Sequence, residues 1–322
     1  MLILTSNELR SLLTMRDCIA AVEDAFRDLA RGEAFSPERL RLVLPNGEGV
    51  LLEMPAYMNS ALGTKIVSVF PGNAKLGLDA VQAAYMLLNA TTGQPLALME
   101  GRFITAIRTA ATSAVATKHL VLPGPKRLGI FGAGVQARFH IEAMMETVEV
   151  ERLLISSRTE AKAAELADWA TATYGVACRQ TGAGEAAGQS DLICTCTGSP
   201  VPLFDGALIR AGTHINAVGA FTPETRELGG ELIRRARVII DSESAAGREA
   251  GDLLIPLREG MIGPSHFAVT LSDVVSQKRA GRTSNDEITI FKSCGLAIED
   301  LATAHLAYSK AVERGAGTSI DL

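Results

Sequence analysis

The stretch 128-LGIFGAGVQA-137 decides the fold of this chain of 322 residues. An apolar run that reads as a buried strand passes directly into the pattern G-x-G-x-x-A at Gly132 to Ala137, and a helical pattern follows it. In this setting Gly132 allows a tight turn, and Gly134 lets a pyrophosphate approach the helix N-terminus, where unpaired N–H groups favour an anion. The stretch therefore predicts a dinucleotide site, and the alternative is a tight strand–helix turn without a ligand.

The sequence around the glycine turn continues this alternation. The apolar strand runs lie at 127–131, 152–156, 191–197, 213–219 and 237–241, and the helical stretches lie at 136–146, 160–174 and 226–236. Continuous apolar strands that alternate with helices are typical of a parallel sheet covered on both faces. We therefore predict an α/β fold with a Rossmann-type, doubly wound parallel sheet in this part of the chain.

The residues before the glycine turn have a different pattern. The apolar spacing over 7–31 predicts one helix that ends at Gly32, and 105–120 reads as a helix of small residues. Between them lie short strand-like runs at 40–45, 49–57, 64–70, 83–90 and 96–100. The turn residues at 91–95 join the last two runs, so we predict an antiparallel sheet here. The prolines at 123–125 mark a linker, and the chain ends with a strand at 287–293 and a long helix.

Composition limits the class of protein. Apolar residues make up 47% of the chain and charged residues 21%, and the formal net charge is −5. This balance is typical of a globular protein and argues against nucleic-acid binding, which favours a basic face. No apolar run reaches the roughly 18 residues of a membrane span, and the start lacks a signal peptide, so we expect a cytoplasmic protein with no membrane partner. Cys194 and Cys196 form a C-x-C without partners at zinc spacing, so we expect reduced structural thiols and no metal.

The end of the second predicted strand suggests the choice of cofactor. Many dinucleotide sites place an acid here to bind the ribose 2′-OH, but this chain has Ser156, Ser157 and Arg158. Serine hydroxyls can donate to phosphate oxygens, and an arginine can pair with a phosphate through two N–H groups; Lys162, one turn on, adds charge. The pattern favours NADP(H) with NAD(H) as the alternative, unless Arg158 is only a solvated charge at a helix start.

Five segments together resemble the ornithine cyclodeaminase/mu-crystallin family. They are 64-TKIVSVFPGN-73, 105-TAIRTAATSAVATKHL-120, 132-GAGVQA-137, 216-NAVGAFTPETREL-228 and 291-FKSCGLAIEDLATA-304. The resemblance implies an α+β substrate and dimerisation domain at 1–122 and 295–322, a Rossmann domain at 123–294, and a homodimer. Together with the glycine turn and the second strand it implies these cofactor-binding residues: Thr109, Gly132, Gly134, Val135, Gln136, Ser156, Ser157, Arg158, Thr197, Gly198, Val218 and Gly219.

The resemblance also implies a cationic clamp for a substrate carboxylate. The matching residues are Arg41, Lys65 and Arg108, of which Lys65 and Arg108 are the expected catalytic residues. The sequence itself supports Arg108, because we predict it in the first turn of a helix, where the dipole disfavours a cation unless an anion binds. The alternative for Arg108 is an exposed arginine that reaches water.

One position departs from the cyclodeaminases of this family. They carry an aspartate in V-G-G-D-x-P-G-K, where this chain has Phe221 in 218-VGAFTPET-225. Cyclodeamination needs acid–base work that a phenyl ring cannot supply, whereas an aromatic wall suits a small ring. We therefore predict an NADPH-dependent oxidoreductase that reduces a cyclic ketimine carboxylate, Δ1-pyrroline-2-carboxylate or Δ1-piperideine-2-carboxylate, to proline or pipecolate. The alternatives are an ornithine or lysine cyclodeaminase with recycled NAD(H), an alanine dehydrogenase-like enzyme, and an NADPH-dependent ligand-binding protein of the mu-crystallin type.

Overall fold

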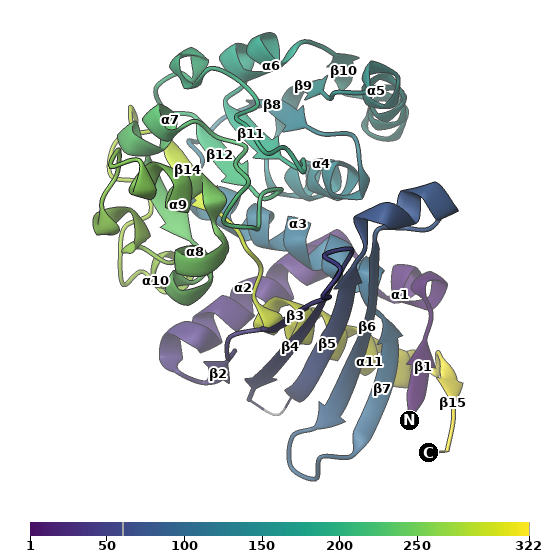
Figure 1. Ribbon diagram of the computed structural model, residues 1–322. Helices are drawn as coiled ribbons and strands as arrows, with labels where there is room; N and C mark the ends of the chain where they lie inside the picture. The colour runs from purple at the N-terminus through teal and green to yellow at the C-terminus, as the bar shows by residue number, and fades with distance from the viewer. Residues whose placement is uncertain (60, 322) are drawn as a thin grey trace. The chain divides into compact units, whose positions relative to one another are not determined.

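The computed structural model describes residues 1–59 and 61–321, which form two compact units (Figure 1). Unit 1 comprises Met1–Thr112 and Leu296–Leu322, and unit 2 comprises Ser113–Gly295. The first division falls inside helix α3 (Gly101–Leu120), before the proline-rich stretch at 123–125 where we predict the linker. No helix of the described chain is both long and apolar enough to cross a membrane.

Unit 1 contains a sheet that is antiparallel in its centre. Its strands are β1 (Leu2–Leu4), β2 (Ala34–Phe35), β3 (Leu40–Val43), β4 (Val50–Met58), β5 (Ala61–Val69), β6 (Val81–Asn89), β7 (Pro95–Glu100) and β15 (Thr318–Ser319). The order is β15-β1-β7-β6-β5-β4-β2, and β3 also pairs with β4. The predicted antiparallel sheet and its hairpin are confirmed, whereas β1 and β15 lack a clear sequence signal because they are too short to show alternation.

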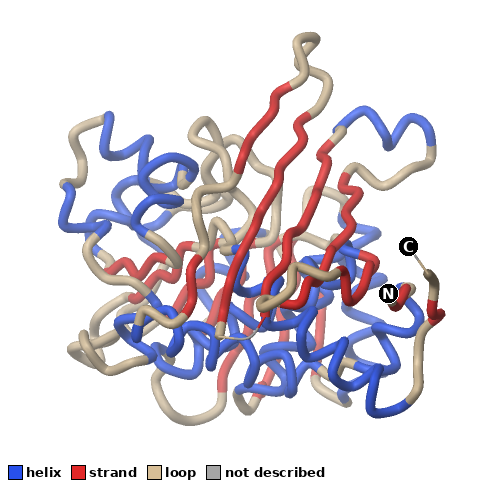
Figure 2. Tube along the Cα trace, turned by 90° about the horizontal axis from the view of Figure 1, so that it is seen from below, coloured by secondary structure: helices blue, strands red, loops and turns tan. Residues whose placement is uncertain are grey.

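Helices cover one face of this sheet (Figure 2). Helix α11 (Ala297–Arg314) contacts β4, β5 and β6, and helix α2 (Met15–Arg31) packs on α11. Cys18, Val22 and Phe26 of α2 are buried, as their spacing on one helix face requires. Glycines in the left-handed conformation end both helices, at Gly32 and Gly315, which is a common way to satisfy the last carbonyl groups.

Two helix predictions in unit 1 need correction. The predicted helix 7–31 is two helices, α1 (Ser6–Leu12) and α2, because Leu13 is extended and the Thr14 side chain accepts from the backbone N–H of Asp17 to begin a new helix. The predicted helix 105–120 begins earlier, at Gly101. Arg108 therefore does not lie in a first helical turn, and the expected conflict with the helix dipole does not exist.

Unit 2 contains the predicted Rossmann-type parallel sheet. Its strands are β8 (Lys126–Phe131), β9 (Val150–Ser156), β10 (Ala177–Gln180), β11 (Leu192–Thr195), β12 (His214–Ala217), β13 (Arg237–Ile240) and β14 (Thr289–Lys292). Every pair in the described sheet is parallel, in the order β10-β9-β8-β11-β12-β14-β13. The chain runs from β8 outward to β10 and then returns to β11 on the other side, so the topological switch lies between β8 and β11.

The helices of unit 2 lie along this sheet (Figure 1). They are the last part of α3, α4 (Val135–Thr147), α5 (Glu160–Tyr174), α6 (Ala183–Gln189), α7 (Gly230–Arg235), α8 (Glu243–Glu249), α9 (Gly251–Arg258) and α10 (Leu271–Val275). Short 3₁₀ helices lie at Pro71–Leu76 (η1) in unit 1 and at Gly206–Leu208 (η2) and Pro264–Phe267 (η3) in unit 2. The predicted helix 226–236 is shorter than expected, because its first residues instead form a loop that contains the buried Glu227.

Candidate active site

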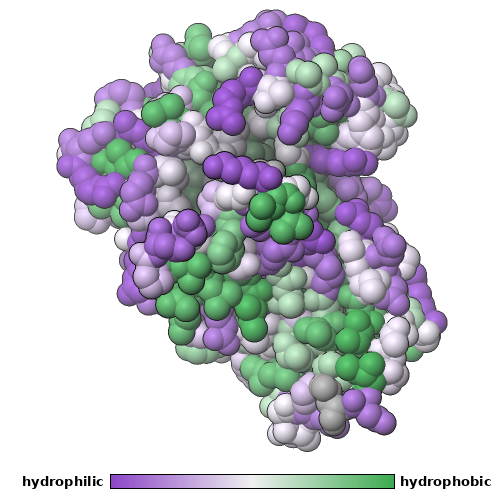
Figure 3. Space-filling model, turned by 45° about the vertical axis from the view of Figure 1, so that its right-hand side comes forward, coloured by the Kyte–Doolittle hydropathy of each residue, from purple (hydrophilic) through white to green (hydrophobic). Residues whose placement is uncertain are grey.

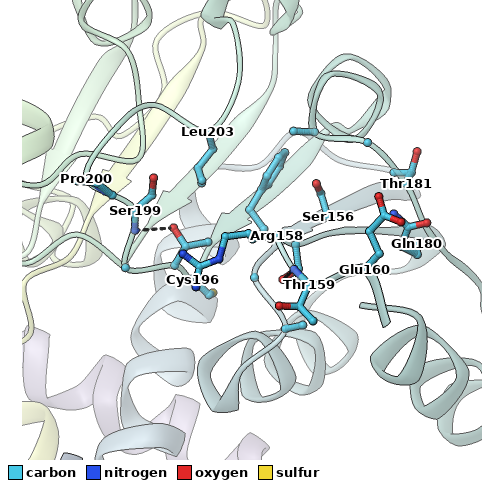
Figure 4. Close-up of a pocket in the computed structure, with 18 residues that line it drawn as sticks. Ser156, Arg158, Thr159, Glu160, Gln180, Thr181, Cys196, Ser199, Pro200 and Leu203 are labelled. Carbon is cyan, nitrogen blue, oxygen red and sulfur yellow. Dashed lines mark hydrogen bonds between the residues drawn. The ribbon is translucent and has the colours of Figure 1, made fainter. Parts of the chain in front are cut away.

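A pocket of about 600 Å³ opens at the carboxyl edge of the unit 2 sheet (Figure 4). Its walls come from the loops that follow β8, β9, β10 and β11, on both sides of the switch point, where doubly wound sheets bind their ligands. The structure brings these predicted cofactor residues into its lining: Gly132, Ser156, Ser157, Arg158, Thr197 and Gly198. The other predicted residues of unit 2 lie beside these loops, with Val135 and Gln136 in the first turn of α4 and Val218 and Gly219 after β12. Thr109 belongs to the part of α3 in unit 1.

The glycine turn has the geometry that a dinucleotide requires. Gly132 has a φ of 111°, and a Cβ there would lie 2.6 Å from the carbonyl oxygen of Cys196. Gly134 begins α4 in an extended conformation without a side-chain cap, and a Cβ there would meet nothing within 4 Å. The first N–H groups of α4 are therefore left for an anion, and Ala137 is fully buried in the packing of α4. These residues fit a bound pyrophosphate.

Hydroxyl groups and one cation surround the other end of the pocket. Figure 4 shows Ser156, Arg158 and Thr159 close together, with Gln180, Thr181 and Glu160 on one side and Cys196, Ser199 and Pro200 on the other. Ser156 is buried at the end of β9, and Arg158 is exposed. The donors suit a phosphate group, while Glu160 adds a carboxylate to the same lining. Lys162 is exposed on α5, outside the residues that line the pocket.

Unit 1 contains a buried cluster of four charged side chains. Lys65 on β5 donates to both carboxylate oxygens of Asp300 on α11, at 2.8 Å each. Arg108 on α3 donates through Nε to Asp300 at 3.0 Å and through a terminal nitrogen to Glu299 at 2.5 Å. Lys65 is 1% exposed and Arg108 is 5% exposed, and both carboxylates are fully buried. We call this group the charge cluster.

Burial and neighbouring charges decide how the two cations titrate. Burial lowers the pKa of Lys65 to about 8, and the positive charge of Arg108 acts in the same direction, although Asp300 opposes it. Burial also opposes the charge of Arg108, but the charges of Asp300 and Glu299 outweigh it and raise the pKa of Arg108. Of these two cations, Lys65 is therefore the one that changes charge within reach of neutral pH.

Sequence reasoning missed the two acids of the charge cluster. It placed Lys65 and Arg108 in one site, and the structure does bring these two side chains together, but Glu299 and Asp300 already pair with them. An isolated sequence signal for the acids exists, because both lie among the apolar positions of 297–307 in the last helix. Two adjacent buried acids need buried cations, but the sequence does not say which ones.

Strand register gives the position of Arg41 relative to Lys65. Arg41 is exposed on β3, opposite Leu52, and Leu52 is opposite Val67, two residues along β5 from Lys65. Arg39 precedes β3, and continuing the register places it opposite Met54, the strand partner of Lys65. The charge of Arg39 is also among those that lower the pKa of Lys65. Arg39 is therefore a second candidate for the third cation, and sequence reasoning passed over it.

Phe221 lies after β12 and is 42% exposed. Thr222 and Thr225, in the same loop, share a hydrogen bond of 2.9 Å. The side chain of Phe221 is thus free to contact a ligand, as an aromatic wall for a substrate ring requires.

His140, His214 and Cys194 of unit 2 are fully buried, whereas Cys196 is partly buried and lines the pocket. Burial lowers the pKa of His140 to about 4 and that of His214 to about 3, so both rings are neutral near pH 7. His140 contacts the hydroxyl of Ser113 at 2.9 Å and the carbonyl of Gln136 at 2.8 Å. Burial raises the pKa of Cys194 to about 12, and it also raises the pKa of Cys196 well above its ordinary value. Within residues 1–59 and 61–321, no group of three or more histidine, cysteine or acidic side chains could hold a metal ion.

A doubly wound sheet with this glycine turn and a pocket at its switch point defines a dinucleotide-binding enzyme of the oxidoreductase class. The chain belongs to the ornithine cyclodeaminase/mu-crystallin family, whose model matches residues 1–315. The predicted family, fold class and enzyme class are therefore confirmed.

Three proteins that are similar to this chain in sequence have known or assigned names. A Δ1-pyrroline-2-carboxylate reductase of Bacillus cereus (strain ZK / E33L) is 40% identical over 325 residues, which cover 100% of both chains. The solved structure of Thermococcus litoralis Δ1-pyrroline-2-carboxylate reductase in complex with NADH and L-proline is 41% identical, with a TM-score of 0.96, over 99% of this chain and 100% of that one. An archaeal alanine dehydrogenase dimer with bound NAD is 34% identical, with a TM-score of 0.95, over 99% of this chain and 98% of that one.

Proposed function

We propose that this protein is an NAD(P)H-dependent reductase of a small cyclic ketimine that carries a carboxylate next to the C=N bond. The observation that carries the proposal is the similarity along the whole chain to a reductase whose solved complex holds NADH and L-proline. The substrates are then Δ1-pyrroline-2-carboxylate or Δ1-piperideine-2-carboxylate, and the products are proline or pipecolate. One methylene separates the two rings and is worth only about 1–3 kcal/mol in a pocket, so both belong to the proposal.

The nicotinamide cofactor is proposed to bind at the pocket of unit 2. The uncapped start of α4 would receive the pyrophosphate, and the loops after β11 and β12 would hold the nicotinamide end through Thr197, Gly198, Val218 and Gly219. Ser157 and Arg158 would hold a ribose 2′-phosphate, which favours NADP(H) over NAD(H). Glu160 in the same lining opposes that preference through its charge, so both cofactors should bind.

The charge cluster of unit 1 is proposed to hold the substrate carboxylate. The Lys65 ammonium and the Arg108 guanidinium keep N–H groups beyond those that bind Asp300 and Glu299, and these are the donors for a carboxylate. Because the acids fix both cations in place, the carboxylate would orient the adjacent C=N carbon with little further ordering. The nicotinamide supplies the hydride that this carbon receives. The third cation of the clamp is Arg41 by resemblance, and Arg39 by strand register and by its effect on Lys65.

Reduction is favoured over cyclodeamination by the residue at 221. Cyclodeamination needs a proton acceptor for the substrate amine and a proton donor for the departing ammonia, and a phenyl ring supplies neither. Reduction of a preformed ring needs fewer proton transfers from the protein, because the ring nitrogen can already be protonated when the substrate binds. The exposed side chain of Phe221 is then an apolar surface that a substrate ring would cover.

A homodimer is proposed through the outer face of the unit 1 sheet, which is the face away from α11. Strand alternation and register place Leu40, Leu42, Tyr57 and Ile66 on this face, and each of these side chains is more than 40% exposed. Figure 3 shows apolar side chains gathered where the N-terminal strands lie. An exposed apolar face of this kind marks an interaction site, and the similar archaeal alanine dehydrogenase is a dimer.

The test is a substrate panel with the purified protein, followed at the nicotinamide absorbance with NADPH and with NADH. We expect reduction of the two cyclic imines and no ammonia from L-ornithine. Ammonia release from ornithine, with proline formed and no net change in cofactor, would establish a cyclodeaminase instead. Reduction of pyruvate with ammonia alone would establish an alanine dehydrogenase, and cofactor binding without turnover of any member would establish a binding protein.

A further inference from the structure

Glu227 lies at the centre of a buried network at the carboxyl edge of the unit 2 sheet. Its carboxylate accepts from the hydroxyl of Thr195 at 2.7 Å, from the hydroxyl and the backbone N–H of Thr197 at 2.6 and 2.7 Å, and from the backbone N–H of Gly219 at 2.7 Å. The side chain is fully buried. One carboxylate therefore joins the loop after β11 to the loop after β12.

A second layer of charges fixes Glu227 in turn. Asp252, in the first turn of α9, accepts from the backbone N–H groups of Glu227 at 2.7 Å and Leu228 at 2.9 Å. Lys292, at the end of β14, lies 3.0 Å from Asp252 and donates to the carbonyl oxygen of Ala217 at 3.2 Å. All three charged side chains are buried, and the network that they form extends from β14 through α9 to the two loops.

The two loops that Glu227 joins approach each other closely at Gly219. A Cβ at Gly219 would lie 2.0 Å from the carbonyl oxygen of Thr197 and 2.6 Å from a carboxylate oxygen of Glu227. Thr197 and Gly198 line the pocket, whereas the residues at its other end, Ser156 to Glu160 and Gln180 to Ala183, follow β9 and β10. The four hydrogen bonds that the carboxylate of Glu227 accepts come from the end of β11 and from the loops after β11 and β12, and not from the loops at that other end.

We propose that Glu227 is a positioning residue that sets the separation of Thr197 and Gly219 and so holds the nicotinamide end of the cofactor, but not its adenosine end. The inference rests on the proposed function, which places the nicotinamide at these loops. A carboxylate suits the task because it accepts at every position, whereas a glutamine would present its own N–H groups to at least one of the four donors. The loops would then separate at that donor.

The test compares two ligands on the Glu227→Gln variant by calorimetry. NADPH contains both ends of the cofactor, and adenosine 2′,5′-bisphosphate contains only the adenosine end. We expect the affinity for NADPH to fall by about tenfold or more, the size of one lost charge-assisted hydrogen bond. The affinity for the bisphosphate should stay within about twofold. In turnover, kcat should fall while KM for the imine changes little.

Control variants separate positioning from general damage. Glu185→Gln also removes a carboxylate that accepts from a threonine, Thr181, but it is an exposed carboxylate at the adenosine end, so the variant should leave the ratio of the two affinities unchanged. Thr195→Val removes one donor to Glu227 at a fully buried residue that does not line the pocket. It should show the same selective loss as Glu227→Gln, to a smaller degree, and it decides the question if Glu227→Gln does not fold. Equal weakening of both ligands, or no weakening of NADPH, overturns the inference. Failure of the unaltered protein to bind NADPH at all overturns the proposed function itself and the inference with it.

Discussion

Lys65 and Arg108 bring two positive charges into the interior of unit 1, and Glu299 and Asp300 bring two negative charges to meet them. Removing four charges from water is costly, and mutual attraction repays that cost only when the geometry is good and the remaining polar groups are hydrogen bonded. Such a group is poor evidence for added stability. It is better understood as a way to hold two cations rigidly, so that a substrate carboxylate meets donors that are already in position.

The first prediction at the scale of single residues concerns pH. Because burial lowers the pKa of Lys65 to about 8, its ammonium is charged below that pH and neutral above it. If the charged form holds the substrate carboxylate, kcat/KM should fall as the pH rises through about 8. The effect on stability has the opposite sign. The folded protein releases this proton at a lower pH than the unfolded chain, so charged Lys65 disfavours folding below pH 8, and that penalty disappears between about 8 and the ordinary value of 10.5.

Lys65→Arg separates this titration from that of the substrate. A guanidinium stays charged at every pH of interest, so the fall in kcat/KM near pH 8 should disappear in the variant. The measurement is a pH profile of kcat/KM for both proteins, with thermal unfolding recorded at each pH. A fall that persists unchanged in an active Arg variant would assign the titration to another group.

The second prediction distinguishes the two candidates for the third cation. The strand register places Arg39 nearer to Lys65 than Arg41, and the charge of Arg39 lowers the pKa of Lys65. Arg39→Ala should therefore raise KM for the cyclic imine by about tenfold or more, which corresponds to the loss of one charged hydrogen bond. Arg41→Ala should change KM much less, because Arg41 is exposed and opposite Leu52. Steady-state kinetics at fixed NADPH measure both. The reverse order of effects would restore Arg41 to the clamp.

The third prediction concerns cofactor choice. If Ser157 and Arg158 hold a 2′-phosphate, NADPH should bind more tightly than NADH. Arg158→Ala should then reduce the difference in binding free energy between the two cofactors by about 1–3 kcal/mol. Lys162→Ala is the matched control, because Lys162 is exposed on α5 and does not line the pocket. This variant should change the difference in binding free energy between the two cofactors little. Titration with both cofactors measures the effect. Equal affinity of the unaltered protein for NADPH and NADH would contradict the assignment.

At the scale of elements, the two glycines of the turn between β8 and α4 have different roles, one in folding and one in ligand binding. Gly132 permits a backbone conformation with positive φ against the carbonyl of Cys196, which is a requirement of folding. Gly134 faces open space at the start of α4, which is a requirement of ligand approach. The same short motif therefore combines a structural need with a binding need.

The fourth prediction separates these two needs. Gly132→Ala should lower the thermal unfolding temperature and weaken cofactor binding, because the added methyl meets backbone atoms at 2.6 Å and the positive φ becomes strained. Gly134→Ala should leave the unfolding temperature nearly unchanged while it weakens binding, because its methyl would occupy space meant for the pyrophosphate. Calorimetric unfolding and NADPH titration of both variants test this. A stability loss at Gly134 equal to that at Gly132 would refute the distinction.

At the scale of the whole molecule, one face of the unit 1 sheet lies under α11 and the other carries exposed apolar side chains. The fifth prediction is that Ile66→Asp, near the middle of this outer face, converts a dimer into a monomer, because the interface would bury an unpaired carboxylate. Leu76→Asp is the control, since Leu76 is more exposed but lies in η1 outside the sheet. Sedimentation velocity measures the mass. A monomeric unaltered protein, or an Ile66→Asp variant that remains dimeric, would rule out this interface.

Local features could be predicted from the sequence because their signals lie within a few residues of one another. The glycine turn at 132–137, the parallel strands around it and the hairpin at 83–100 follow from spacing and turn chemistry, and the structure has them as predicted. The residues at the end of β9 also line the pocket, because the carboxyl ends of neighbouring parallel strands meet at one edge of the sheet. The break at Leu13 and the start of α3 were misjudged, since capping and helix starts depend on single residues.

Only the tertiary structure decided which charges meet. Arg108 and Glu299 are separated by 191 residues, and no periodicity or spacing links a cation on one helix to an acid on another across that distance. The same holds for Glu227, which is one of two acids in 224-ETRE-227 and becomes the buried link between two loops only through contacts with Thr195, Thr197 and Gly219. The physical reason is that a buried charge is stable only beside its partners, and the fold, rather than the sequence near that charge, supplies them.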